Sequence, residues 1–251
     1  MRKFILIICA ALLFAGCAAS EDNNTQQLNT AISAVNGESK ISADYMLEIS
    51  FGGSVLYYSA GSANWDKAEK TGNLQFKQTH LGAASEVKSF FTPKSMINIT
   101  NGKVYEYNRN AETLLSVFPC FAVPAPQGKV TLGKNSIGDT YKFTRTDGKA
   151  LLKSLIGGDI YSLATAITKP QRDKTRYGEV ECTYTLKDGG LNSCRYEFDV
   201  TLYDTPLASA AGLPDESKYT LNLHISAKVT YKETGAGVKV EKYSTPDELL
   251  D

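Results

Sequence analysis

The residues able to do acid–base, nucleophilic or metal chemistry are few and widely spaced in this chain. Its only histidines, His80 and His224, cannot make a histidine-rich metal site and argue against a histidine-dependent catalytic relay. No G-x-S-x-G, H-E-x-x-H, C-x-x-C or phosphate-binding glycine loop is present. Glu179 and Glu181 share one side of a predicted strand, and without a cleft they are not an acid/base pair. We therefore expect a protein that is not an enzyme and that holds no metal and no cofactor.

Three cysteines, Cys120, Cys182 and Cys194, lie beyond the N-terminal region. In the predicted hairpin 177–204, strand alternation places Cys182 and Cys194 on the same side of neighbouring strands. Two interpretations follow. The pair forms a cross-strand disulfide, which an exported protein permits, or both thiols are buried and act as small apolar side chains.

The first 17 residues have the order of an export signal. Two basic residues at positions 2 and 3 precede an apolar run over 4–15 that is short for a bilayer span. The run ends in L-F-A-G-C at 13–17, which resembles the lipobox of bacterial lipoproteins, with Phe14 where that family usually has an aliphatic residue. The resemblance implies that the Cys17 thiol is acylated. The alternatives are an ordinary secreted protein and an uncleaved anchor.

We accordingly expect a signal peptide over 1–16, a lipidated tether over 17–24, and a single domain over 25–251. The tether has almost no apolar side chain to bury, so it should stay in water. Acyl chains on Cys17 would hold the exported protein to a membrane of the cell envelope.

The amino-acid composition limits the classes of partner that the domain can bind. The 251 residues include 27 Lys or Arg and 27 Asp or Glu, and 42% are hydrophobic, which suffices for a core. Removal of Arg2 and Lys3 with the signal peptide leaves a slight acidic excess. A nucleic-acid-binding domain needs a basic excess to neutralise phosphates, so no nucleic acid is expected. We expect a monomer.

Hydrophobic periodicity predicts mostly strands. A helix is expected over 25–36, and two short helices within 149–169, separated by Gly157-Gly158 and ended by Pro170. The predicted strands are 45–51, 55–58, 72–79, 86–92, 95–100, 103–108, 113–118, 128–132, 139–146, 177–187, 192–204, 218–232 and 237–243. We expect a mainly β (α+β) fold: a strongly curved antiparallel sheet, or unclosed β-barrel, of about ten strands with helices covering the concave face.

This order of elements, a lipobox, a short helix, a long meander, a helical pair and closing strands, is similar to that of the lipoprotein-carrier superfamily. The superfamily includes the Lol-type (LolA/LolB-like) and LppX/LprG-like lipid-binding proteins. The resemblance implies a half-barrel whose apolar concave face, lidded by helices, holds a lipid or another hydrophobic ligand.

The candidate lining residues lie on the predicted helical pair, with two phenylalanines at the cavity mouth: Leu151, Leu155, Ile156, Tyr161, Leu163, Ile167, Phe118 and Phe121. The alternative is that the helices plug the barrel permanently and that the segment with the two phenylalanines only covers the core.

A second function remains open, that of a cell-surface module which contacts glycan or protein through its loops. Trp65, the only tryptophan, is expected in a loop over 62–66 and is the single candidate for a sugar-stacking platform.

Overall fold

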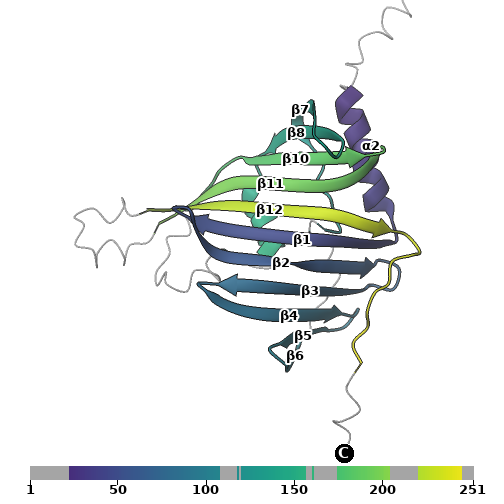
Figure 1. The fold of residues 1–251 in the computed structure, drawn as a ribbon, viewed down its shortest axis with the longest axis vertical. Helices are drawn as coiled ribbons and strands as arrows, with labels where there is room; N and C mark the ends of the chain where they lie inside the picture. The colour runs from purple at the N-terminus through teal and green to yellow at the C-terminus, as the bar shows by residue number, and fades with distance from the viewer. Residues whose placement is uncertain are drawn as a thin grey trace, which may run out of the picture.

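One antiparallel sheet dominates the computed structural model, which describes residues 23–107, 118, 120–156, 160, 174–203 and 220–244. The sheet has twelve strands, is unclosed, and curves around the helices (Figure 1). This confirms the predicted fold class, with more strands than the ten or so expected.

The strands vary in length from two residues in β9 to 15 in β12. They are β1 (Lys40–Phe51), β2 (Ser54–Asp66), β3 (Thr71–His80), β4 (Ala83–Phe91), β5 (Met96–Thr100), β6 (Lys103–Tyr107), β7 (Gln127–Lys134), β8 (Asp139–Arg145), β9 (Arg176–Tyr177), β10 (Val180–Lys187), β11 (Gly190–Tyr203) and β12 (Thr220–Thr234). The helices of the described residues are α2 (Asn23–Gly37) and α4 (Gly148–Ile156). Strand order across the sheet is β6-β5-β4-β3-β2-β1-β12-β11-β10-β8-β7, with β9 beside β11.

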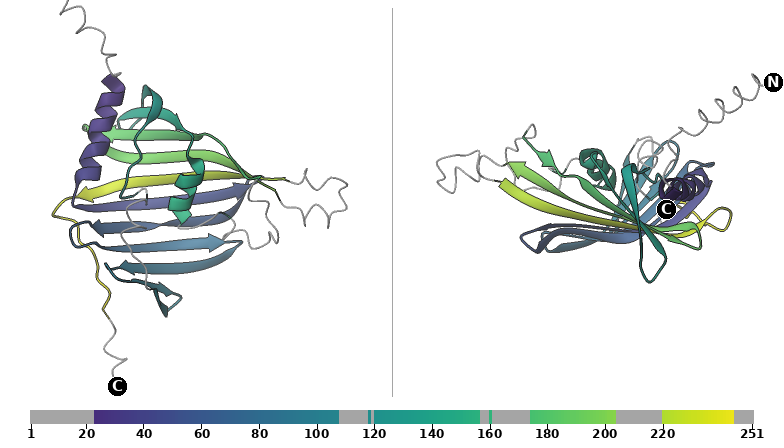
Figure 2. Two further views of the ribbon diagram at one scale, coloured as in Figure 1. Left: turned by 180° about the vertical axis from the view of Figure 1, so that it is seen from behind. Right: turned by 90° about the horizontal axis from the view of Figure 1, so that it is seen from above.

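Strand alternation gives the sheet an inner and an outer face. In β1, every second residue from Ile41 to Ile49 is buried, and the residues between them are half-buried. The partner strand β12 alternates in step, because Leu47 lies opposite Ala227 and Ile49 opposite Ile225. Both α2 and α4 lie on the same side of the sheet (Figure 2). We call that side the inner face and the opposite side the outer face.

A single hydrophobic core fills the space between the inner face and the helices. From α2 it receives Leu28, Ile32 and Val35, which share one side of the helix at three- and four-residue spacing. The helix expected over 25–36 is therefore confirmed, and it anchors the domain's first residues to β7 and β11.

Strand β2 is much longer than its sequence suggested. It continues through Gly61 to Asp66, so Trp65 belongs to a strand and not to the expected loop. Residues 59–63, Ser-Ala-Gly-Ser-Ala, carry no apolar alternation, which is why the pattern seemed to end at Tyr58. Pairing with β1 on one side and β3 on the other keeps these small residues extended.

The strand expected over 237–243 is not formed. After a turn at Gly235 the chain leaves the sheet and packs on the outer face. There the Tyr243 and Phe90 rings lie 5.7 Å apart between centroids, and the Asn73 side-chain oxygen accepts a hydrogen bond of 3.0 Å from the Glu241 backbone N–H.

Several expectations fall outside the described residues. These are the signal peptide, Cys17 and most of the tether, most of the strand over 113–118, and most of the second helix of the pair. In the described part of the chain, no helix is long and apolar enough to cross a membrane.

Candidate functional site

The inner face of the sheet is covered unevenly. On β12 and β11 the inward side chains, such as Ile225, Tyr196 and Val200, are completely buried. On β3 and β5 the inward side chains of Leu74, Phe76 and Met96 are only half-buried. The β2–β5 part of the inner face, which we call the open half, therefore keeps apolar surface within reach of a ligand.

Helix α4 lies across the middle of this face. Its first residue, Gly148, is packed so closely that a Cβ atom would stand 3.2 Å from the Gly178 carbonyl oxygen and 3.4 Å from the Phe198 ring. Its last turn reaches β1, where the Tyr45 hydroxyl donates a hydrogen bond of 3.0 Å to the Leu155 carbonyl oxygen. Burial raises the pKa of Tyr45 well above its ordinary value, so this hydroxyl stays protonated and able to donate.

The predicted lining residues divide into three groups. Leu151 and Leu155 are buried in the core under α4, and Ile156 is half-buried and packs against that core. Tyr161, Leu163 and Ile167 lie outside the described residues. Ile160, which the sequence pattern did not single out, is 2% exposed and belongs to the same core. The helix over the first half of the predicted pair is thus present, and a lining role for these side chains stays a prediction.

Phe118 and Phe121 lie in the core, where they make a cluster of rings with Tyr45 and Trp65. Ring centroids are 5.3 Å apart for Tyr45 and Phe118, 5.7 Å for Phe118 and Phe121, and 5.2 Å for Trp65 and Phe121. The position fits the core-covering alternative for this segment. Trp65 is 6% exposed, so it cannot serve as a platform for an external sugar.

A polar group that the sequence did not reveal marks one end of the open half. Tyr57 and His80 are paired across β2 and β3, with ring centroids 6.2 Å apart, and the Tyr57 hydroxyl donates to the Gln78 side-chain oxygen at 3.3 Å. Ser59, opposite Gln78, faces the same way and is 1% exposed. The sequence did not reveal this group because the predicted strand ended at Tyr58. Ser59 and Gln78 can be assigned to the inner face only when the full length of β2 is known.

The three cysteines in the described part of the chain, Cys120, Cys182 and Cys194, are free thiols. Cys182 lies opposite Tyr196, and Cys194 lies opposite Tyr184, so the two cysteines are diagonal neighbours and not a facing pair. In the structure the two sulfurs are not bonded and both side chains are buried, and the possible disulfide stays a prediction. Burial raises the pKa of Cys182 to about 12 and raises that of Cys194 as well, which keeps both sulfurs protonated and poorly nucleophilic.

An ion pair fixes the start of α4. The Asp147 carbonyl oxygen accepts the first helical hydrogen bond, from the Leu151 N–H, at 3.0 Å. The Arg145 guanidinium donates two hydrogen bonds, of 2.9 and 2.5 Å, to the Asp147 carboxylate. It also donates a hydrogen bond to the Ala125 carbonyl oxygen. The hydrogen bond from Arg145 lowers the pKa of Asp147 below its ordinary value.

Replacing Arg145 by methionine is expected to cost about 2 kcal/mol of stability at neutral pH, because Asp147 and the Ala125 carbonyl lose their donor. Since the folded-state pKa of Asp147 is lowered, the wild-type contribution is present above pH of about 4 and is lost progressively as the pH falls below that value. The variant should lack this acid-dependent loss. Urea unfolding at neutral and acidic pH measures both effects.

The matched control is Arg195→Met. Arg195 contacts Glu197 at 2.7 Å, but both side chains are substantially exposed, so a change within about 0.5 kcal/mol is expected. Equal losses in the two variants would contradict a special role for the Arg145 pair.

The described residues hold no group of three His, Cys, Asp or Glu side chains placed to bind a metal ion. No family model matches the chain, and no curated protein matches it. Among solved structures, LprF from Mycobacterium bovis aligns with a TM-score of 0.49 and 14% identity, over 88% of this chain and 97% of that one. The ywiB protein from Bacillus subtilis aligns with a TM-score of 0.19 and 9% identity, over 78% and 94%. At these values neither likeness bears on what this chain binds.

Proposed function

We propose that this protein is a non-enzymatic lipoprotein of the cell envelope that binds or passes on a lipid-like molecule at the inner face of its sheet. The observation that carries the proposal is the open half, where Leu74, Phe76 and Met96 remain half-buried while most inward side chains of β1, β12 and β11 are buried. Covering apolar surface releases about 25 cal/mol per Å², so an acyl chain laid along these strands would be held by the hydrophobic effect.

The proposal also predicts the orientation of the bound ligand. Its apolar part would lie against β3–β5 and against Ile156 at the end of α4, which is half-buried next to the core. Its polar end would lie near Tyr57, Gln78 and His80, which offer hydroxyl, amide and imidazole groups at the end of the sheet. An amphiphilic ligand matches both regions. Its apolar chain would lie on the apolar strands, and its polar group would have hydrogen-bond partners and so would not be buried without them.

A polar substitution inside the open half tests the site. Leu74→Gln in the purified full chain is expected to weaken binding of a fluorescent fatty acid about tenfold, because an amide would replace apolar contact surface. The matched control is Leu132→Gln, since Leu132 lies at the far edge of the sheet on β7 and is 51% exposed. Titration by fluorescence measures both affinities, and circular dichroism verifies that both variants are folded.

The wild-type protein should also release lipid on solvent extraction, detected by mass spectrometry. The proposal is overturned if extraction yields no lipid and the fatty acid binds the wild type and Leu74→Gln equally or not at all.

Membrane attachment is tested separately through the N-terminus. Cys17→Ser removes the thiol that the lipobox resemblance marks for acylation, so the variant is expected to move from the membrane pellet to the soluble fraction. The wild type should gain the mass of its acyl groups, each buried CH₂ contributing about 0.8 kcal/mol to membrane affinity. Unchanged mass in the wild type, or a variant that stays in the pellet, would exclude Cys17 as the anchor.

A further inference from the structure

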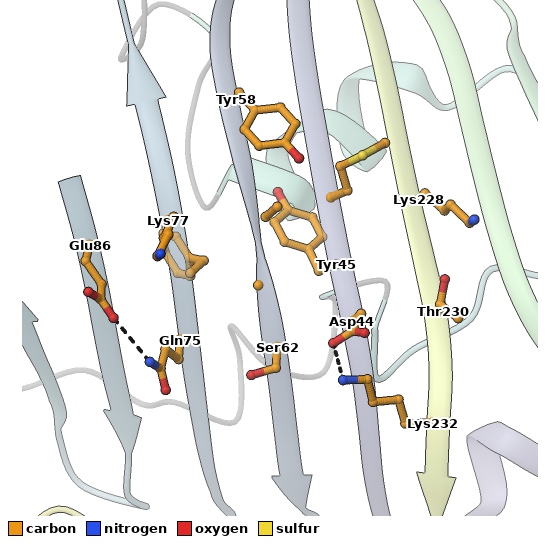
Figure 3. Close-up of a pocket in the computed structure, with 14 residues that line it drawn as sticks. Asp44, Tyr45, Tyr58, Ser62, Gln75, Lys77, Glu86, Lys228, Thr230 and Lys232 are labelled. Carbon is orange, nitrogen blue, oxygen red and sulfur yellow. Dashed lines mark hydrogen bonds and ion pairs between the residues drawn. The ribbon is translucent and has the colours of Figure 1, made fainter. Parts of the chain in front are cut away.

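A hollow of about 700 Å³ lies on the outer face of the sheet, across five neighbouring strands from β12 to β4. Its polar lining residues include Asp44, Gln75, Lys77, Glu86 and Lys228, and Tyr58 stands at one end (Figure 3). Because strand alternation places these side chains on the face away from α2 and α4, the hollow is separate from the open half.

The hollow exists because its floor is built from small residues. Ala60, Gly61 and Ser62 of β2 all line it, and longer side chains of the adjoining strands surround them. A Cβ atom at Gly61 would stand 2.5 Å from the Cα atom of Phe76, so β2 approaches β3 more closely here than any other residue would allow. The floor of the hollow at these three positions is therefore made by short residues, and no long side chain of β2 fills it there.

The carboxylates of the hollow are already engaged. Asp44 forms an ion pair of 2.8 Å with Lys232, and Glu86 accepts a hydrogen bond of 3.2 Å from the Gln75 amide. Both interactions are drawn in Figure 3. The carboxylates can still accept further hydrogen bonds, because each has two oxygens with several lone pairs.

Three lysines line the hollow, and two of them, Lys77 and Lys228, form no ion pair with another described residue. They belong to one cross-strand row, in which Lys77 lies opposite Ala60, Ala60 opposite Met46, and Met46 opposite Lys228. Three strand spacings separate the two ends, so their Cα atoms are about 14 Å apart. Lys77 and Lys228 thus mark the two ends of a cross-strand row whose middle positions, Ala60 and Met46, are small or apolar.

We propose that this hollow binds an extended acidic oligosaccharide. Two sugar carboxylates on one chain would pair with Lys77 and Lys228, and the Tyr58 ring would present its apolar body to a sugar ring. Sugar hydroxyls would donate to Asp44 and Glu86. A nucleic acid is disfavoured, because the chain has no basic excess to neutralise its phosphates. The proposal concerns the opposite face from the lipid site and is independent of it.

Calorimetric titration of the full chain with an oligogalacturonate and with a neutral maltooligosaccharide of equal length tests the site. The acidic sugar is expected to bind about tenfold more tightly than the neutral one. Lys77→Gln combined with Lys228→Gln should remove this preference, since each exposed pair contributes up to about 1 kcal/mol. Tyr58→Ala should weaken binding of both sugars. The control is Lys142→Gln, an exposed lysine on β8 outside the hollow, which should leave the affinity unchanged.

A second measurement works on the unmodified protein. Bound oligogalacturonate should protect Lys77 and Lys228 from acetylation, as read by peptide mass spectrometry, and leave Lys142 reactive. The proposal fails if the acidic sugar does not bind, if both sugars bind equally, or if Lys142→Gln lowers the affinity as much as the double substitution. Equal protection of all three lysines would also overturn it.

Discussion

Replacing Gly61 by alanine is expected to lower the free energy of unfolding by about 3 kcal/mol, because the new methyl group would overlap the neighbouring strand. A Cβ atom there would meet the Gln75 carbonyl oxygen and the Cα atom of Phe76. Both are backbone atoms of β3, so no side-chain rotation relieves the overlap, and β2 and β3 would have to separate where Gly61 lies opposite Phe76. Urea denaturation followed by circular dichroism measures the loss.

Gly37→Ala provides the control. Gly37 ends α2, and a Cβ atom at this position would have nothing within 4 Å, so stability should change by less than about 0.5 kcal/mol. If Gly61→Ala is as stable as the wild type, β2 and β3 do not approach each other as closely as described.

Trp65→Ala is expected to destabilise the protein by about 4 kcal/mol, since it removes a large side chain that is 6% exposed and packs against the Phe121 ring. Trp65→Phe should cost only about 1 kcal/mol. The indole N–H has no hydrogen-bond partner among the described residues, so this change loses volume and no hydrogen bond. Thermal and urea unfolding of both variants give the two values.

The same pair of variants decides between two roles for this residue. A sugar platform would lose glycan binding in Trp65→Ala while keeping wild-type stability. If Trp65 is a core residue, its replacement lowers the stability of the protein. The loss is much larger for alanine than for phenylalanine, because alanine leaves a larger cavity. A Trp65→Ala variant of undiminished stability would restore the loop interpretation of residues 62–66.

The fold class could be predicted because the strongest periodic signals lie in the strands at the sheet centre. In β1 and β12, alternation from Tyr45 to Phe51 and from Leu221 to Tyr231 is uninterrupted, and it places those residues correctly on one face. The inner faces of these central strands pack against the core along their whole length. Apolar residues therefore recur at every second position, and this alternation is visible in the sequence.

The errors have identifiable physical causes. Residues 59–63 look like a turn, but β1 and β3 hold them extended, a long-range effect that a local pattern does not contain. Residues 237–243 alternate like a strand, yet both edges of β12 are already paired with β1 and β11, so no edge remains for a returning strand. Parity placed Cys182 and Cys194 on the same face correctly, but the register that makes them diagonal depends on the bulge between Thr185 and Leu186.

The candidate sites were less predictable than the fold. The first half of the helical pair was found, since Leu151 and Leu155 follow helical spacing and are buried as expected. The outer hollow could not be found, because its members come from five strands and meet only through the register. A row such as Lys77, Ala60, Met46 and Lys228 has no counterpart in the linear sequence.

The adjacency of β1 and β12 has a consequence for biosynthesis. These are the first and last strands of the domain, and they pair at the centre of the sheet, with Ala43 opposite Tyr231. The central ladder therefore cannot close until almost the entire chain has been made, and contacts of such high sequence separation form slowly. A chain that threads through an export channel must remain unfolded until it has passed. In the exported protein proposed above, this topology would delay folding for that interval, so that the sheet would close only after β12 had emerged.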